Sequence, residues 1–334
     1  MIQPKRLSLA LLPTPLHRLD RTSELYGASL WVKRDDLTGA VETGNKIRKL
    51  EFLAADALSK GADMLITCGG EQSNHSRATA IVARKLGMDV HLVLRRTAEG
   101  PSGNFLLDII LGASIRWVTP DEYENRDEIL QEEAEKFRAK GRHPYIIPEG
   151  GSNALGIWGY VLAAQELAKQ ANQMGFQPDY AIVPSGSGGT YTGLWIGFRS
   201  IGAKTEVIGI TAGPDTAEQR EHIEKTAAKF CLEYEARIPL NPAEIKLVDG
   251  FWRKGYGVID EDVARFIGEF AQREGIILDP TYTAKAFMGA LTMLKNGELP
   301  KGKNIVLWHT GGIFGIFTKG QYFREIFFSG ERVK

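Results

Sequence analysis

Short apolar runs alternate along the chain with longer segments in which apolar residues recur every three or four positions. The short runs predict strands, and the periodic segments predict amphipathic helices. The predicted strands are 29–33, 64–67, 90–94, 115–118, 145–147, 180–183, 207–211 and 305–308. The clearest predicted helices are 48–58, 76–86, 128–139, 160–173, 262–274 and 284–295, with a further one from Tyr191.

The order of these elements predicts a parallel sheet. Strands that alternate with helices of this length, often with glycine at the junction, are typical of βαβ units. The runs Ala181-Ile182-Val183 and Ile305-Val306-Leu307 contain no polar residue, as expected when helices cover both faces of a sheet. The pattern therefore indicates an α/β fold, in which ligands bind beyond the carboxyl ends of the strands.

Composition narrows the class of partner. The chain of 334 residues is long enough for two domains, and its 41 basic and 41 acidic side chains balance. No basic cluster favours nucleic acid or an anionic membrane, and no stretch approaches the roughly 20 apolar residues of a membrane span. Two cysteines, Cys68 and Cys231, are too few for a disulfide framework. We expect a cytoplasmic protein that binds a small molecule.

The loop Pro184-Ser185-Gly186-Ser187-Gly188-Gly189-Thr190 follows a predicted strand and opens into a predicted helix. Glycines let backbone N–H groups approach an anion, hydroxyls add donors, and a helix N-terminus adds positive potential. A phosphate is therefore the expected occupant. A dinucleotide fingerprint would need glycine where Tyr191 stands, and a P-loop would need a Gly-Lys-Ser/Thr sequence, which is missing. A single phosphate group, as on pyridoxal phosphate, needs only one such loop.

Pyridoxal phosphate also needs a lysine, and Gly44-Asn45-Lys46-Ile47-Arg48-Lys49 supplies two candidates. The pattern places Lys46 in the turn before a helix and Lys49 on the helix itself. A lone lysine is usually a solvated surface charge. The phosphate loop is what makes Lys46 a candidate for the covalent link to the cofactor.

A third polar run, Gly69-Gly70-Glu71-Gln72-Ser73-Asn74-His75-Ser76, joins a predicted strand to a predicted helix. Ser73 or Asn74 can cap this helix, and free N–H groups in its first turn can receive a carboxylate. The length of the run suggests a pocket for a substrate carboxylate. The six histidines show no metal-ligand spacing, so no metal site is predicted.

Taken together, several motifs resemble the family that contains 1-aminocyclopropane-1-carboxylate deaminase and D-cysteine desulfhydrase. They are 44–50, 72–74, 185–190, Asp279-Pro280-Thr281-Tyr282-Thr283 and His309-Thr310-Gly311-Gly312, in the family's order. The resemblance implies the tryptophan-synthase-β-like fold of pyridoxal-phosphate enzymes, fold type II, with two parallel-sheet domains and the cofactor between them. It implies a large domain of residues 1–49 and 160–334, a small domain of residues 50–159, and a homodimer.

The resemblance also implies site roles. Lys46 would form the Schiff base, Asn74 would hydrogen-bond the cofactor's 3′-oxygen, and Ser73 with the start of its helix would hold the substrate carboxylate. Tyr282 matches an active-site tyrosine, and Tyr256 resembles a second one. The remaining expected contacts are Asn45, Ser185, Gly186, Ser187, Gly188, Gly189, Thr190, Thr283 and Thr310 to the cofactor, and His75, with Asn74 and Tyr282, to the substrate.

Two positions favour one branch of this family. Its deaminases carry glutamate directly after the tyrosine and leucine before the final Gly-Gly, where this chain has Thr283 and Thr310. A carboxylate near the pyridine nitrogen would favour a strong electron sink, whereas a neutral hydroxyl supports less carbanion delocalisation. Expelling hydrosulfide requires less of that sink than opening a cyclopropane ring.

The resulting hypothesis is a pyridoxal-phosphate-dependent carbon–sulfur lyase, D-cysteine desulfhydrase, that converts D-cysteine to pyruvate, hydrogen sulfide and ammonia. The amine of Lys46, with its pKa lowered by burial, would remove the α-proton, although Tyr282 or Tyr256 could act there or on the departing sulfur. Alternatives within the lyases are L-cysteate sulfo-lyase and 1-aminocyclopropane-1-carboxylate deaminase. A nucleotide-dependent oxidoreductase is the alternative from another class.

Overall fold

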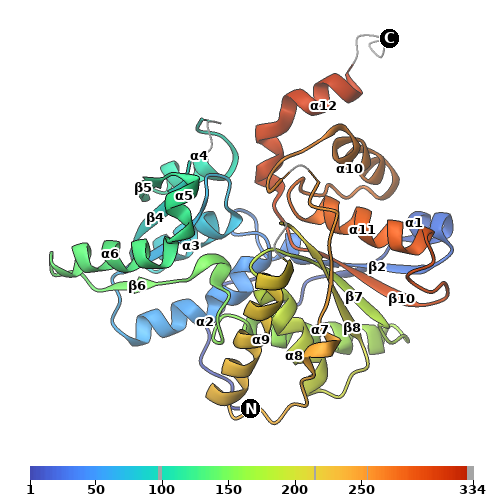
Figure 1. Cartoon of the computed structure of the whole chain (residues 1–334), viewed down its shortest axis with the longest axis horizontal. Coiled ribbons are helices and arrows are strands. Elements are labelled where there is room, and N and C mark those ends of the chain that lie inside the picture. The colour runs from blue at the N-terminus through green and yellow to red at the C-terminus, as the bar shows by residue number, and fades with distance from the viewer. Residues whose placement is uncertain (97–99, 214–215, 254, 329–334) are drawn as a thin grey trace.

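A computed structural model describes residues 1–96, 100–213, 216–253 and 255–328. The strands form two sheets that lie in different parts of the molecule (Figure 1). One sheet has six strands in the order β1-β2-β10-β7-β8-β9, and the other has four in the order β5-β4-β3-β6. All neighbouring strands are parallel except β1 and β2, which are antiparallel. The predicted α/β fold with parallel sheets is confirmed.

The strands are β1 (Leu16–Arg18), β2 (Ser29–Arg34), β3 (Met64–Gly70), β4 (Asp89–Arg95), β5 (Ser114–Val118), β6 (Pro144–Ile146), β7 (Tyr180–Ser185), β8 (Glu206–Thr211), β9 (Lys246–Val248) and β10 (Asn304–His309). All eight predicted strands are present within a few residues of their predicted ends. The sequence pattern missed β1 and β9, three-residue strands at the two edges of the six-stranded sheet, because Arg18 and Lys246 leave no apolar run there.

The helices are α1 (Asp20–Tyr26), α2 (Asn45–Ser59), α3 (Asn74–Lys85), α4 (Gly103–Ile110), α5 (Pro120–Glu124), α6 (Arg126–Arg138), α7 (Trp158–Gln173), α8 (Gly189–Ser200), α9 (Thr216–Glu233), α10 (Glu261–Glu274), α11 (Thr283–Lys295) and α12 (Gly320–Phe327). Short 3₁₀ helices are η1 (Asp35–Leu37), η2 (Glu149–Gly151), η3 (Pro242–Glu244) and η4 (Ile313–Lys319). Two starts differ from prediction in a way that matters for function. α2 begins at Asn45 and α8 at Gly189, so Lys46 lies in the first helical turn rather than in the turn before it.

Helices cover both faces of the six-stranded sheet, as the continuous apolar runs predict. In β10, Val306 and Trp308 pack into one core with α7, α8 and α9, whereas Ile305 and Leu307 pack into another with α10 and α11. Figure 1 shows these two helical layers on opposite sides of β7, β8 and β10. Adjacent residues of a strand point to opposite faces, so burying both faces selects an uninterrupted apolar sequence.

The four-stranded sheet is also covered on both faces. Leu65 and Leu92 pack with α2 and α3, whereas Met64 and Val93 pack in a core that α6 completes. All four strands come from residues 64–146, inside the predicted small domain of residues 50–159. The domain boundaries themselves stay a prediction, since α2 and α7 run across the two predicted junctions.

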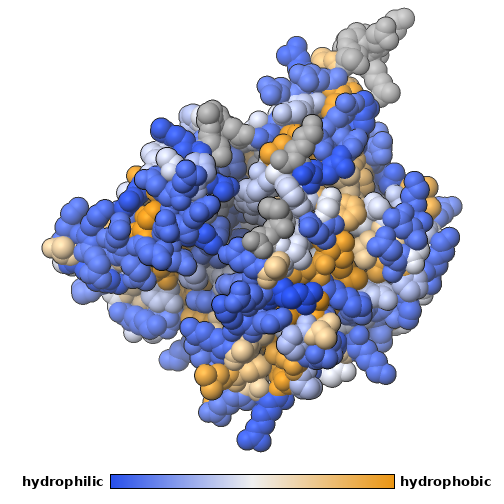
Figure 2. All heavy atoms as spheres, in the orientation of Figure 1, coloured by the Kyte–Doolittle hydropathy of each residue, from blue (hydrophilic) through white to orange (hydrophobic). Residues whose placement is uncertain are grey.

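The visible surface differs between the two parts. Figure 2 shows mostly hydrophilic side chains on this face, while hydrophobic ones gather over the part that holds the six-stranded sheet and its helices. Within the described residues, no helix has the length and the apolar character needed to cross a bilayer.

Candidate active site

A cavity of about 730 Å³ lies where loops from the two sheets face each other. One side is built by the start of α3, the end of β4, α5 and η2. The other is built by the loop between β7 and α8, by α9 and by the segments around Tyr256, Tyr282 and Thr310. These loops leave the carboxyl ends of parallel strands, which is where α/β sheets bind ligands. Lys46 also lines the cavity.

The start of α2 is fixed against the segment that follows β10. Gly44 has φ 108°, a conformation that favours glycine, and a Cβ there would lie 2.8 Å from the carbonyl oxygen of Thr310. The Asn45 N–H donates to that oxygen at 3.0 Å, and the Asn45 side-chain amide donates to Thr190 Oγ1 at 3.0 Å. Asn45 thereby joins the helix that carries Lys46 to the predicted phosphate loop.

Lys46 has the electrostatic character of a reactive amine. Burial lowers its pKa to about 8, partly opposed by the negative charge of Glu149. About a tenth of the amine is therefore unprotonated at pH 7, far more than for an ordinary lysine, and the unprotonated form is what a nucleophile or base requires.

Lys49 plays a different part, although it lies only one turn further along α2. Its side chain is buried, and its Nζ donates to Gly150 O at 3.1 Å and to Ser152 Oγ at 3.0 Å. Burial, and then the charge of Lys46, lower its pKa well below the ordinary value. Lys49 is not among the residues that line the cavity. This arrangement favours Lys46 as the cofactor lysine.

The loop between β7 and α8 leaves its helix start uncapped. Gly188 is the N-cap residue with φ 77°, and no side chain of the described residues accepts from the first-turn N–H groups of α8. Ser185 Oγ is buried with no hydrogen-bond partner among the described residues. Gln219 of α9 binds the other side of the loop, donating to the carbonyls of Ser185 at 3.0 Å and of Gly186. The donors of this loop are therefore available to an anion.

The start of α3 is built differently. Ser73 is its N-cap, and its hydroxyl accepts from the N–H groups of His75 at 3.2 Å and Ser76 at 3.1 Å. The buried imidazole of His75 is paired with Thr67 Oγ1 at 2.9 Å. Burial, followed by the charges of Lys46 and Lys49, lowers the pKa of His75 well below its usual value, so the ring is neutral. Ser73, Asn74 and His75 all line the cavity.

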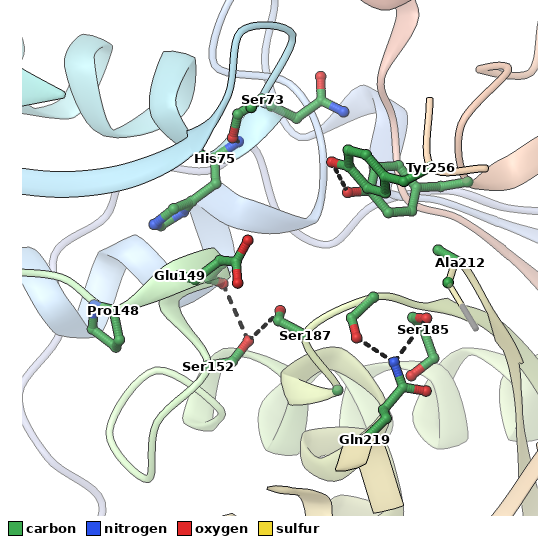
Figure 3. Close-up of a pocket in the computed structure, with 18 of the residues that line it drawn as sticks. Ser73, His75, Pro148, Glu149, Ser152, Ser185, Ser187, Ala212, Gln219 and Tyr256 are labelled. Atoms are coloured by element: carbon green, nitrogen blue, oxygen red, sulfur yellow. Dashed lines mark hydrogen bonds between the residues drawn. The ribbon is translucent and has the colours of Figure 1, made fainter. Parts of the chain in front are cut away.

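Two tyrosines meet in the cavity. The hydroxyl of Tyr256, which is labelled in Figure 3, lies 2.5 Å from that of Tyr282. The Arg95 guanidinium lies 5.6 Å from the centre of the Tyr256 ring. Burial raises both pKa values. The contact with Tyr282 and the charge of Arg95 partly reverse this for the pKa of Tyr256, while Tyr256 raises the pKa of Tyr282 further. Tyr256 is therefore the more acidic member of the pair.

The two threonines at the branch positions lie in different surroundings. Thr310 lines the cavity next to Asn45, whereas Thr283 is buried and is not among the lining residues. The Thr283 hydroxyl donates to Asp279 Oδ1 at 2.7 Å, and the same carboxylate accepts the N–H groups of Thr281, Tyr282 and Thr283. In this structure Thr283 orders the turn that presents Tyr282. Its predicted contact with the cofactor stays a prediction.

Sequence reasoning missed Glu149, whose carboxylate lies between Ser73 and His75 on one side and Ser152 and Ser187 on the other in Figure 3. Its oxygens accept from the Tyr123 hydroxyl at 2.8 Å and pair with Arg126 Nε at 3.0 Å. A signal was present, because Pro148-Glu149-Gly150-Gly151-Ser152 is a polar, glycine-rich run that leaves a strand. Sequence reasoning also missed Ser152, Gln219 and His222, which line the cavity.

Both cysteines are free: Cys68 is buried, and burial raises its pKa to about 12, whereas Cys231 is half-buried. Among the described residues, no group of three or more His, Cys, Asp or Glu side chains could hold a metal ion.

The residues of the cavity fit pyridoxal phosphate. The uncapped start of α8 and the unpartnered, buried Ser185 hydroxyl provide donors for a phosphate, and Lys46 provides an amine of lowered pKa in the same cavity. An α/β fold with such a cavity defines a pyridoxal-phosphate-binding enzyme.

Comparison with known proteins identifies the family. Residues 7–311 match the family described as pyridoxal-phosphate dependent enzyme, and the chain belongs to it. This membership excludes the nucleotide-dependent oxidoreductase considered above. A solved structure described as an ACC deaminase homologue superposes with a TM-score of 0.90 at 38% identity, covering 97% of this chain and 96% of that one. An O-ureido-L-serine synthase at 20% identity, TM-score 0.64, shows the same fold over 96% of this chain and 94% of its own.

Relatives with two different names are similar to this chain over nearly its whole length. A putative 1-aminocyclopropane-1-carboxylate deaminase of Thermotoga maritima is 44% identical, covering 95% of this chain and 99% of its own. A D-cysteine desulfhydrase of Yersinia enterocolitica is 39% identical, covering 95% and 97%. These identities are too close to each other to select one reaction.

Proposed function

We propose that the protein is a carbon–sulfur lyase that converts D-cysteine and water to pyruvate, hydrogen sulfide and ammonia. The observation that carries this choice is Thr283, a neutral residue at the position where the family's deaminases carry glutamate; its hydroxyl is bound to Asp279 in the turn that presents Tyr282. A neutral partner for the ring supports β-elimination of a good leaving group better than it supports opening of a cyclopropane. Thr310, which lines the cavity where the family's deaminases carry leucine, supports the same choice from the sequence.

Bound pyridoxal phosphate supplies an electron-withdrawing ring that stabilises negative charge at the α-carbon of an amino acid. Lys46 would carry the cofactor covalently and, when released, accept the α-proton at Nζ, since its pKa of about 8 suits proton transfer near neutral pH. The loop of residues 185–190, with Asn45 bound to Thr190, would hold the phosphate.

The start of α3 would bind the substrate carboxylate. Ser73 Oγ accepts two backbone N–H groups, which fixes the oxygen and leaves its own hydrogen to donate. The neutral His75 ring adds no charge beside it. On the opposite side of the cavity, Tyr256 would give a proton to the departing sulfur, since Tyr282 and Arg95 make it the more acidic tyrosine.

Elimination of sulfite from L-cysteate is the second candidate, and Arg95 favours it. Its guanidinium lines the cavity, stacked near both Tyr123 and Tyr256, where it could pair with a sulfonate. Removal of ammonia from 1-aminocyclopropane-1-carboxylate has the support of relatives' names but of no feature of this cavity.

The test is a substrate panel for the purified holoenzyme that contains both cysteine enantiomers, L-cysteate and 1-aminocyclopropane-1-carboxylate. We expect sulfide and pyruvate in equal amounts from D-cysteine. Ammonia release from 1-aminocyclopropane-1-carboxylate without sulfide release from cysteine would reverse the choice. Borohydride reduction followed by peptide mapping should place the cofactor on Lys46, and finding it on Lys49 would contradict the site.

A further inference from the structure

A chain of buried polar side chains runs from behind α3 to the cavity wall at Asn74. Arg77 and Asn104 have no solvent exposure, and neither lines the cavity. We propose that Asn104 is a positioning residue that fixes the side-chain amide of Asn74 with its Nδ2 donor toward the cavity. The proposal rests on the proposed function in one respect, the role of Asn74 at the cofactor.

The chain begins with Arg77 on α3, one turn after Asn74. Its Nη groups donate to the carbonyls of Val41 and of Thr43, the latter at 2.9 Å, and its Nε donates to Asn104 Oδ1 at 2.7 Å. A guanidinium has donors only. The side-chain atom of Asn104 that faces Arg77 must therefore be the oxygen.

The orientation of Asn104 then follows on its other side. Asn104 Nδ2 donates to the Gln72 carbonyl at 2.9 Å and to Asn74 Oδ1 at 3.0 Å. The Gln72 carbonyl is an acceptor only, so it requires the amide nitrogen at this position, independently of Arg77. Both neighbours select the same orientation, although N and O of an amide have almost the same shape.

Asn74 has no choice of orientation either. Because Asn104 presents an N–H, the atom of Asn74 that meets it must be Oδ1, and Nδ2 is left on the side of the cavity that Asn74 lines. Close packing keeps the amide in place, since a Cβ on Gly312 would lie only 3.1 Å from Asn74 Nδ2. The site thus receives a donor where a flipped amide would present an acceptor.

This polarity matters for a cofactor whose 3′-oxygen lies beside Asn74, as the proposed function holds. A donor stabilises the negatively charged form of that oxygen, whereas an amide oxygen would repel it. The protonation of this oxygen controls the visible absorbance of the lysine-bound cofactor. Asn104 should therefore affect the absorbance and the cofactor affinity without touching the cofactor.

The deciding variant is Asn104→Asp. Aspartate keeps an acceptor for Arg77, so the fold should be retained, but it cannot donate to Asn74, whose amide then turns its Nδ2 away from the cavity. We expect the affinity of the apoenzyme for pyridoxal phosphate to fall about 10- to 100-fold, as for loss of one hydrogen bond to a charged group. We also expect the absorbance of the bound cofactor to move to shorter wavelength across the pH range. Asn104→Ala, which only frees the amide, should give the same changes at smaller size.

A double-mutant cycle separates positioning from general damage. In an Asn74→Ala background, Asn104→Asp should change affinity and absorbance by less than about twofold, because its target is gone. Thr79→Val is the matched control, since Thr79 is equally buried on α3 and its hydroxyl has no hydrogen-bond partner among the described residues. It should leave both readouts unchanged.

Three results would overturn the proposal: no change in Asn104→Asp, an equal change with and without Asn74, or an equal change in Thr79→Val. The proposed function fails in a different way. It fails if wild-type protein does not carry the cofactor on Lys46, or if Asn74→Ala alone leaves the absorbance unaltered.

Discussion

The starts of α3 and α8 are built from similar residues but offer a ligand different groups. Each follows a buried strand through a loop of glycine and serine, and each lines the cavity. At α3 the Ser73 hydroxyl accepts two of the first-turn N–H groups. At α8 the N-cap is Gly188, and within the part of the chain that the structure describes no side chain accepts from these N–H groups.

The difference assigns the two helices different ligands. A helix start with free N–H groups binds a doubly charged phosphate through the backbone, and the buried Ser185 hydroxyl adds to it. A helix start that is already capped binds through side chains, and a single carboxylate or amide contact suits it better. The residue types of two such loops therefore do not show which ligand each binds. That assignment also requires knowing which residue caps each helix.

The largest effect is expected from a negative charge in the α8 loop. Ser187→Asp places a carboxylate beside the phosphate, where like charges about 4 Å apart cost about 4 kcal/mol at an effective dielectric constant near 20. We expect the affinity of the apoenzyme for pyridoxal phosphate to fall by about 100-fold or more in an absorbance titration. Ser59→Asp, at the exposed end of α2, adds the same charge as a control and should leave the affinity unchanged. An unchanged affinity in Ser187→Asp would place the phosphate elsewhere.

The same substitution at α3 should have a smaller and different effect. Aspartate caps a helix as well as serine does, so the free energy of unfolding of Ser73→Asp should lie within about 0.5 kcal/mol of the wild-type value. For Ser73→Ala, which has no cap, we expect the free energy of unfolding to fall by about 1 kcal/mol. The added charge faces the substrate carboxylate and should raise KM for D-cysteine at least about tenfold. Cofactor affinity should change less than about threefold in both variants. If Ser73→Asp lost the cofactor as Ser187→Asp does, the two helix starts would not be distinct.

Most of this architecture is readable from the sequence, because burial on both faces of a sheet imposes uninterrupted apolar runs. The strand at 305–308 and the glycine-rich loop after Val183 are of this kind. The motifs also predicted that Lys46, Asn74 and Tyr282 lie close together in the fold, although they lie far apart along the chain. The cavity contains all three.

What the sequence could not supply are pairings between distant segments. The hydroxyl of Thr283 is bound to Asp279, and the carboxylate of Glu149 lies beside Tyr123 and Arg126, and no local pattern specifies either arrangement. The start of α2 was misplaced for the same reason. Gly44 and Asn45 begin the helix there because Thr310, 265 residues later in the chain, accepts the Asn45 N–H.

The third prediction concerns Glu149, because its charge affects the pKa of the Lys46 amine in the same cavity. Lys46 has a pKa of about 8, so the reactivity of the apoenzyme amine toward an acylating reagent should rise with pH around that value and not around 10.5. Glu149 raises this pKa, so Glu149→Gln should move the rise to lower pH and increase the rate at pH 7. We expect about a two- to fivefold increase, as for an interaction of up to about 1 kcal/mol near solvent. Peptide mapping confirms the site, and Glu124→Gln, also in the cavity lining, is the control. A slower reaction at pH 7 would contradict the sign.

The smallest effect on cofactor affinity is expected from Gln219, which binds the backbone of the loop before α8. Gln219 donates to the carbonyls of Ser185 and Gly186, and its removal leaves these oxygens to cavity water, which replaces much of the lost bond. For Gln219→Ala we expect a loss of about 0.5 kcal/mol, or two- to threefold, in pyridoxal-phosphate affinity, and no change in KM for D-cysteine. Arg220→Ala is the matched control, since Arg220 also donates to carbonyls from α9 but to those of Pro242 and Ile245, away from the cavity. If Gln219→Ala raised KM and left the cofactor affinity unchanged, Gln219 would act on the substrate. The assignment of the phosphate to the start of α8 and of the substrate to the start of α3 would then be wrong.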